Sequence, residues 1–176
     1  MGAHPTPSDF EARTNATYEA LMWALSRPGL PRDLPAAGQA GIIETLIDRE
    51  CSVYCEDPAM AGLAARSGAA LVAPDKADHL FLSQPPVQLT GLRQGSDMYP
   101  EEGATLVIPV SLGAGDPLRL TGPGVNGVVT LSLSGIPQGF WAERAREMRY
   151  PMGFELFLLD GAKVIGIPRT TVVEVL

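Results

Sequence analysis

The chain has 176 residues, of which 45% are hydrophobic and 19% charged, and its formal net charge is −7. This length suits one domain with a sizeable core, whereas the negative charge argues against the basic face that a nucleic acid or an anionic membrane requires. Because no run of about 18 apolar residues predicts a membrane span and the polar N-terminus lacks the core of a signal peptide, we expect a cytoplasmic protein, with residues 1–7 as a mobile tail.

The first predicted element is a helix that begins at a capping box. Ser8 can accept a hydrogen bond from a first-turn amide while the side chain of Glu11 reaches back. This helix should end near Ser26, because the following Arg27-Pro28-Gly29 cannot continue it. The apolar residues that share one face at helical spacing are Phe10, Tyr18, Leu21, Met22 and Leu25.

Helices and strands then alternate along the chain. Further helices are expected over residues 39–47, from the N-cap Asp57 to residue 66, as a turn over 86–93, and over 137–149. Strands are expected over 51–55, 79–82, 104–110 and 117–121, followed by a C-terminal hairpin that turns at Asp160-Gly161. This order predicts an α/β fold, a three-layer sandwich with a mixed central sheet and helices on both faces.

Two segments near the C-terminus carry a more specific expectation. Residues 113–139 are rich in Gly and Pro, so we expect long surface loops there. Residues 167–176 follow the second strand of the hairpin, and we interpret them as the final strand of the sheet.

Few residues in the sequence are suited to catalysis. Cys51 and Cys55 would lie roughly 13 Å apart along a strand, too far for a disulfide, which needs Cα atoms within about 7 Å; we interpret both as small buried apolar groups. The two histidines, His4 and His79, show no metal-ligand spacing. We therefore expect no metal and no other cofactor.

A literal G-x-G-x-x-G pattern spans residues 122–127 but fails as a dinucleotide-binding motif. That motif must open a helix whose first amides hold the phosphate. Residues 128–133 instead alternate and are rich in β-branched side chains, and Pro123 removes an amide. We interpret the pattern as a glycine-shaped turn.

Two arginines lie in apolar surroundings and need partners for their donors. Arg119 lies within a predicted strand, and Arg169 follows Pro168 at a strand end. Three roles stay open: an internal ion pair, such as Arg169 with Glu174 or Glu155; a subunit interface; or an anion site of a small-molecule binding protein or enzyme. The candidate binding or interface residues are Arg119, Thr121, Gly122, Gly124, Pro168, Arg169, Thr170 and Thr171.

Several ordered motifs resemble those of the PhnH family of bacterial phosphonate metabolism. They are Ser26-Arg27-Pro28-Gly29, Glu102-Gly103-Ala104-Thr105-Leu106, Leu118-Arg119-Leu120-Thr121-Gly122-Pro123-Gly124, Tyr150-Pro151-Met152-Gly153 and Ile167-Pro168-Arg169-Thr170-Thr171, with Val173-Glu174-Val175 after it.

The resemblance implies a subunit of the carbon–phosphorus lyase system, which converts alkylphosphonates and a nucleoside triphosphate into ribose-linked phosphonate triphosphates. It implies the other core subunits as partners, and a homodimer when the chain is isolated. It also implies a fold related to the large domain of pyridoxal-phosphate transferases without the cofactor. The scarcity of lysine agrees with that, because that cofactor needs a lysine for its Schiff base. Of the two lysines, Lys76 lies in a predicted loop and Lys163 in the final hairpin just past its turn. We expect a non-catalytic structural subunit.

Overall fold

The computed structural model describes residues 6–176, so the expectations for His4 and for most of the N-terminal tail lie outside the described residues. The helices of this part are α1 (Asp9–Ser26), α2 (Ala40–Leu46), α3 (Pro58–Arg66) and α4 (Phe140–Glu147), with short 3-10 turns at Pro74–Lys76 and Pro100–Glu102. None of these helices is long and apolar enough to cross a lipid bilayer.

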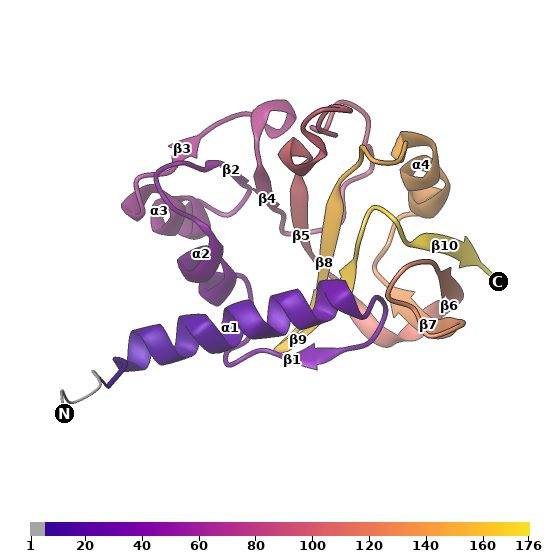
Figure 1. Cartoon of the computed structure of the whole chain (residues 1–176), viewed down its shortest axis with the longest axis horizontal. Coiled ribbons are helices and arrows are strands. Elements are labelled where there is room, and N and C mark those ends of the chain that lie inside the picture. The colour runs from indigo at the N-terminus through magenta and orange to yellow at the C-terminus, as the bar shows by residue number, and fades with distance from the viewer. Residues whose placement is uncertain (1–5) are drawn as a thin grey trace.

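The fold is α/β and is built on a mixed central sheet, as the sequence predicted. Its seven strands follow the order β1-β9-β8-β5-β4-β2-β3 (Figure 1). The strands from β8 to β3 are parallel, and β9 and β1 are antiparallel to their neighbours. Their bounds are β1 (Arg32–Asp33), β2 (Ser52–Cys55), β3 (Ala70–Leu71), β4 (His79–Phe81), β5 (Thr105–Pro109), β8 (Glu155–Asp160) and β9 (Lys163–Ile167).

Apolar side chains pack on both faces of this sheet. Along β5, Leu106 and Ile108 point to one core and Val107 to the other, and all three are fully buried. The alternation follows from the two-residue period of a strand, and burial on both faces explains the continuous apolar sequence. Helices α1, α2 and α3 cover the face of Val107, whereas the opposite core includes Phe140 and Trp141 of α4.

A second, three-stranded sheet covers that opposite face together with α4 (Figure 1). Its order is β10-β6-β7, with bounds β6 (Ser111–Thr121), β7 (Val129–Ser134) and β10 (Val172–Val175). The expected long loops over 113–139 are therefore wrong in large part, because β6 and β7 pair through an irregularity between Leu112 and Pro117. Residues 167–176 are also not one strand of the central sheet, since β9 ends at Ile167 and β10 belongs to the small sheet.

The capping box of α1 is present as predicted, and only part of the predicted apolar face is buried. Leu21 is buried together with Ala20 and Ala24, whereas Phe10, Tyr18 and Met22 are exposed. Small side chains face the sheet because α1 approaches β9 closely: a Cβ on Gly166 would lie 2.6 Å from the backbone of Ala24. The expected helical turn over 86–93 is absent, and this segment is irregular.

Gly166 gives a test of this close approach. Gly166→Ala should lower the free energy of unfolding by about 1–3 kcal/mol, the cost of overpacking a well-filled core, because the new methyl group meets helix backbone that cannot rotate away. Gly62→Ala is the matched control: no atom lies within 4 Å of that Cβ, on the exposed side of α3. It should instead stabilise by about 0.5–1 kcal/mol. Urea unfolding of both variants measures the difference, and equal effects would contradict the packing argument.

Candidate functional site

The Pro168–Thr171 turn carries the chain from the central sheet to the small sheet, and Arg169 holds it in place. The amide of Thr171 donates to the carbonyl of Pro168 at 2.9 Å, which closes the turn. The Arg169 Nε lies 2.5 Å from Glu155 Oε1, and its backbone amide donates to Glu155 Oε2 at 2.7 Å. Its Nη1 donates to the carbonyls of Pro100 and Pro151. Of the three roles left open for Arg169, the structure shows the ion pair with Glu155.

Arg144 of α4 holds both ends of the same turn. Its guanidinium donates to the carbonyl of Thr171 at 3.0 Å and to that of Pro168 at 2.7 Å. Arg144 was missed in the sequence, although a signal was present: it lies three and four residues after the buried Trp141 and Phe140, hence on their face of the helix. Its neighbours Glu143, Arg146 and Glu147 make the segment resemble a solvated surface instead.

The turn, α4 and β10 surround a pocket of about 680 Å³. The predicted residues Arg169, Thr170 and Thr171 line it, together with Pro123 and Arg144. Its apolar lining comes from Trp141, Ala145, Met148, Tyr150, Val172 and Val173.

The remaining predicted residues lie outside this pocket. Arg119 is on the exposed side of the small sheet, 3.4 Å from Glu174 of β10. Gly122 does pack against the turn: a Cβ there would lie 2.7 Å from the Thr170 carbonyl oxygen. Gly124 approaches the end of α1 in the same way, 2.7 Å from the Ser26 carbonyl oxygen. The glycine-rich segment is thus a close-packed turn that leads into strand β7, as its sequence indicated.

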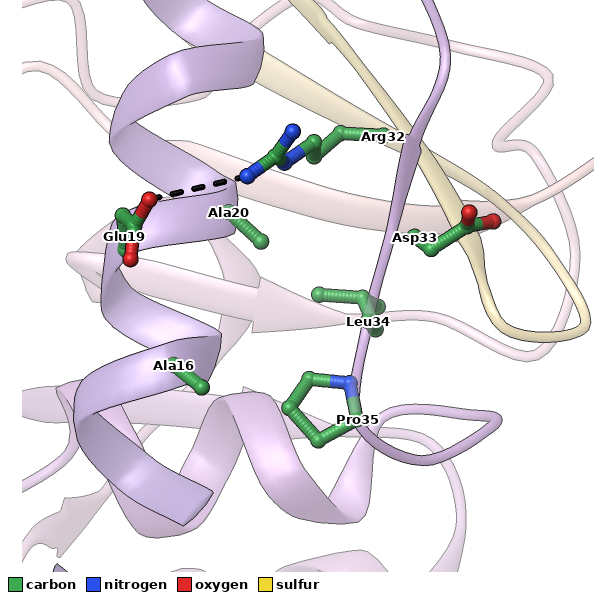
Figure 2. Close-up of a pocket in the computed structure, with 7 residues that line it drawn as sticks. All are labelled: Ala16, Glu19, Ala20, Arg32, Asp33, Leu34 and Pro35. Carbon is green, nitrogen blue, oxygen red and sulfur yellow. Dashed lines mark ion pairs between the residues drawn. The ribbon is translucent and has the colours of Figure 1, made fainter. Parts of the chain in front are cut away.

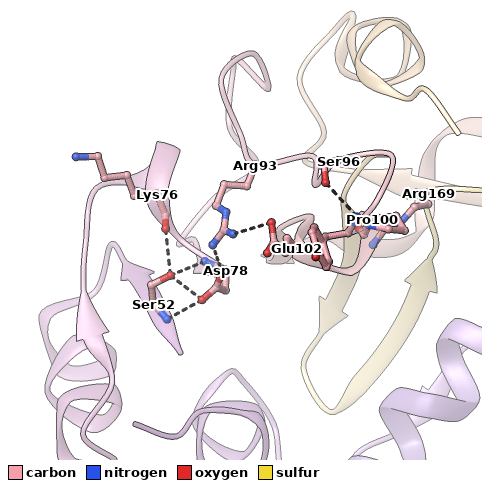
Figure 3. Close-up of polar contacts among 9 residues, drawn as sticks. Ser52, Lys76, Asp78, Arg93, Ser96, Pro100, Glu102 and Arg169 are labelled. Carbon is pink, nitrogen blue, oxygen red and sulfur yellow. Dashed lines mark hydrogen bonds and ion pairs between the residues drawn. The ribbon is translucent and has the colours of Figure 1, made fainter. Parts of the chain in front are cut away.

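A polar network closes the edge of the sheet where the parallel strands begin (Figure 3). Arg93 pairs with Asp78, which accepts hydrogen bonds from the amide and hydroxyl of Ser52 at 2.8 and 2.6 Å. Partial burial opposes ionisation of Asp78, but the bonds from Ser52 and the charge of Arg93 outweigh it and lower the pKa. Because the charged groups of this network already have partners within the fold, we assign the network to stability.

Neither thiol in the described chain is activated. Cys51 and Cys55 are both free and half-buried, and both pack against the helix-side core. Burial, reinforced by the nearby carboxylate of Asp57, raises the pKa of Cys55 to about 11. Among residues 6–176, no group of three or more histidine, cysteine or acidic side chains could hold a metal ion.

Comparisons with known proteins define the class to which this fold and site belong. Residues 7–174 match the family described as bacterial phosphonate metabolism protein (PhnH), and the chain belongs to that family. It is 34% identical over 169 residues to "Putative C-P lyase subunit protein HtxG" of Stutzerimonas stutzeri, covering 90% of this chain and 85% of that protein. It is 28% identical over 187 residues to alpha-D-ribose 1-methylphosphonate 5-triphosphate synthase subunit PhnH of Rhizobium meliloti (strain 1021), covering 94% and 91%.

The two predicted arginines should differ sharply in their contribution to stability. Arg169→Ala leaves the Glu155 carboxylate, whose side chain is only 19% exposed, without its cation. Removing one partner of a buried pair costs about 3–5 kcal/mol. Arg119→Ala is the control, because Arg119 and Glu174 are about half exposed and such surface pairs contribute about 1 kcal/mol or less. Urea unfolding near neutral pH compares them, and similar losses would refute a structural role for Arg169.

The thiols should alkylate slowly. With a pKa of about 11, roughly 0.1% of Cys55 is thiolate at about pH 8. Its labelling rate with iodoacetamide should therefore rise about tenfold for each pH unit up to about pH 10, because only the thiolate reacts. Mass spectrometry after timed quenching measures the rate at each cysteine, with the urea-unfolded chain as control. Rapid labelling of the folded chain at neutral pH would indicate an activated nucleophile instead.

Proposed function

We propose that this chain is a non-catalytic, cytoplasmic subunit of a complex that processes phosphonates. The two relatives support this, because each is named as a subunit, one of C-P lyase and one of ribose 1-methylphosphonate 5-triphosphate synthase. In that complex the chain supports formation of the ribose-linked phosphonate triphosphate, and its neighbours are the other core subunits.

The exposed ridge of α1 is the observation that carries the proposal. Phe10, Tyr18 and Met22 are 50%, 52% and 38% exposed and lie along one row at four- and eight-residue spacing. Such rows are the ridges that pack into the grooves of another helix. Large apolar side chains gathered on one solvent-facing element mark a surface for protein association. This ridge therefore offers a surface to a partner subunit, or to a second copy in the homodimer that the resemblance implies.

The arginines of the C-terminal motif also favour a structural role. Arg169 is engaged by Glu155 and two backbone carbonyls, so its charge and most of its donors already have partners in the fold. Arg119 is paired with Glu174 on the surface. An anion site built on these two residues would require both pairs to open.

Co-purification tests the proposal. The tagged chain should retain the products of neighbouring phosphonate genes when all are co-expressed, and the double variant Tyr18→Glu, Met22→Glu should retain at least about tenfold less, because each new carboxylate would be desolvated in the contact. Val87→Glu is the matched control, since Val87 is 79% exposed and lies outside α1. Thermal unfolding establishes that each variant is folded.

Three results would each contradict a different part of the proposal. If the unmodified chain retains none of the neighbouring products, it is not a subunit of such a complex. If the chain retains them and the α1 variant does so equally well, the contact lies on another surface. Turnover of a phosphonate by the purified chain alone would contradict the non-catalytic role.

A further inference from the structure

The pocket between α4, the Pro168–Thr171 turn and β10 combines an apolar wall with a buried charge. Trp141, Met148 and Val173 form part of the wall, and Trp141 is only 7% exposed. Tyr150 and Val172 also line the pocket and are 81% and 54% exposed, so they lie at its rim. A volume of about 680 Å³ lies in the range of roughly 300–1,000 Å³ that is typical of small-molecule sites.

Arg144 supplies a charge that no acidic side chain neutralises directly. It is 2% exposed, and among residues 6–176 no carboxylate lies within 4.0 Å of it. Its Nε and the hydroxyl of Thr171 are both buried and have no hydrogen-bond partner in the described chain. Burial lowers the pKa of Arg144 to about 10 although the charge of the Glu155 carboxylate opposes the shift, so the guanidinium is still charged at neutral pH. A buried charge of this kind is costly unless it is paired.

A second pocket, between α1 and β1, provides a comparison, because the charged side chains that line it are all paired (Figure 2). It measures about 380 Å³, and its charged residues all have partners of opposite sign. Arg32 lies 3.5 Å from Glu19, and Asp33 lies 2.8 Å from the Lys163 ammonium. No acidic side chain lines the α4 pocket. Its two arginines face one carboxylate: Glu155 is ion-paired with Arg169 and acts on Arg144 only from beyond ion-pair distance. Two cations against one acid leave this side of the pocket with a net positive charge.

We propose that the α4 pocket binds a singly charged organic anion with a flat apolar body, its acidic group near Arg144 and its body against Trp141. This site goes beyond the subunit role, which does not depend on it. An opposite charge within about 4–6 Å is stabilising without displacing the turn carbonyls that Arg144 holds. One cation cannot balance the several charges of a nucleoside triphosphate, and the apolar wall gives inorganic phosphate nothing to contact.

Isothermal titration of the full chain with naphthoate and with its neutral isostere naphthamide tests the charge requirement. Naphthoate should bind at least about tenfold more tightly, and its affinity should fall as salt is added. ATP and inorganic phosphate should bind more weakly than naphthoate. Equal affinity for naphthamide would refute the role of Arg144 as the charge anchor, and tighter binding of ATP or phosphate would refute the ligand class.

A matched pair of variants on β10 tests the location. Val172→Glu places a carboxylate at the pocket rim and should weaken naphthoate binding about fivefold or more through repulsion. Val175→Glu makes the same change on the same strand at 55% exposure but does not line this pocket, so it should have less than about a twofold effect. Both positions are exposed, so both variants should fold, which thermal unfolding checks. Equal weakening by the two variants would place the ligand elsewhere.

Discussion

The connection between the two sheets is the constraint on which the C-terminal half of the fold depends. Strand β9, which lies next to the edge strand β1 of the central sheet, ends at Ile167, and β10 begins only five residues later as an edge strand of the small sheet. A turn this tight leaves backbone carbonyls pointing away from both ladders, and buried carbonyls need donors. Arg144 satisfies those of Pro168 and Thr171, while Arg169 ties the same turn to Glu155 on β8. In this turn, side-chain hydrogen bonds from two arginines thus replace the backbone hydrogen bonds that a neighbouring strand would supply.

The same constraint creates the pocket. Because Arg144 must reach the turn from α4, the helix lies beside β10 and leaves a space floored by the turn and walled by Trp141 and Val173. The guanidinium is desolvated by the core around it, while its bonds go to neutral carbonyls and not to a carboxylate. A structural requirement therefore leaves an arginine without a direct ion pair next to an apolar cavity. That combination provides the affinity for an organic anion, whereas Arg169, paired with Glu155, provides little.

Sequence alone predicted the elements whose signals are local. The capping box at Ser8 and the Asp57-Pro58 pair correctly predicted where α1 and α3 begin, and Asp160-Gly161 correctly predicted the turn of the hairpin. The buried face of α1 was not predictable in this way, because it depends on how the helix crosses the sheet: Ala24 lies against the backbone of Gly166 on β9, Leu21 is buried, and Phe10 and Tyr18 stay exposed. Strand β6 was predicted only over 117–121, because the glycines and irregular register of its first half resemble a loop, and β7 was missed as a strand.

The candidate site was predictable in part. The residues that flank an arginine in the sequence show whether it stands out, but they do not show which side chains it will meet in the fold. Apolar flanks made Arg119 and Arg169 conspicuous, yet each finds its acid in a neighbouring strand, a pairing that depends on register between distant segments. Arg144 was concealed by the charges beside it in sequence, although its helical position relative to Phe140 and Trp141 places it in the core. The C-terminal Ile-Pro-Arg-Thr-Thr motif, which is typical of the family, thus serves mainly to hold the fold together. The arginine without a direct ion pair, Arg144, comes from a different segment. A chain can carry a binding pocket and a docking helix together here because the two lie on different elements: α1 packs on one face of the central sheet, and α4 with the small sheet packs on the other.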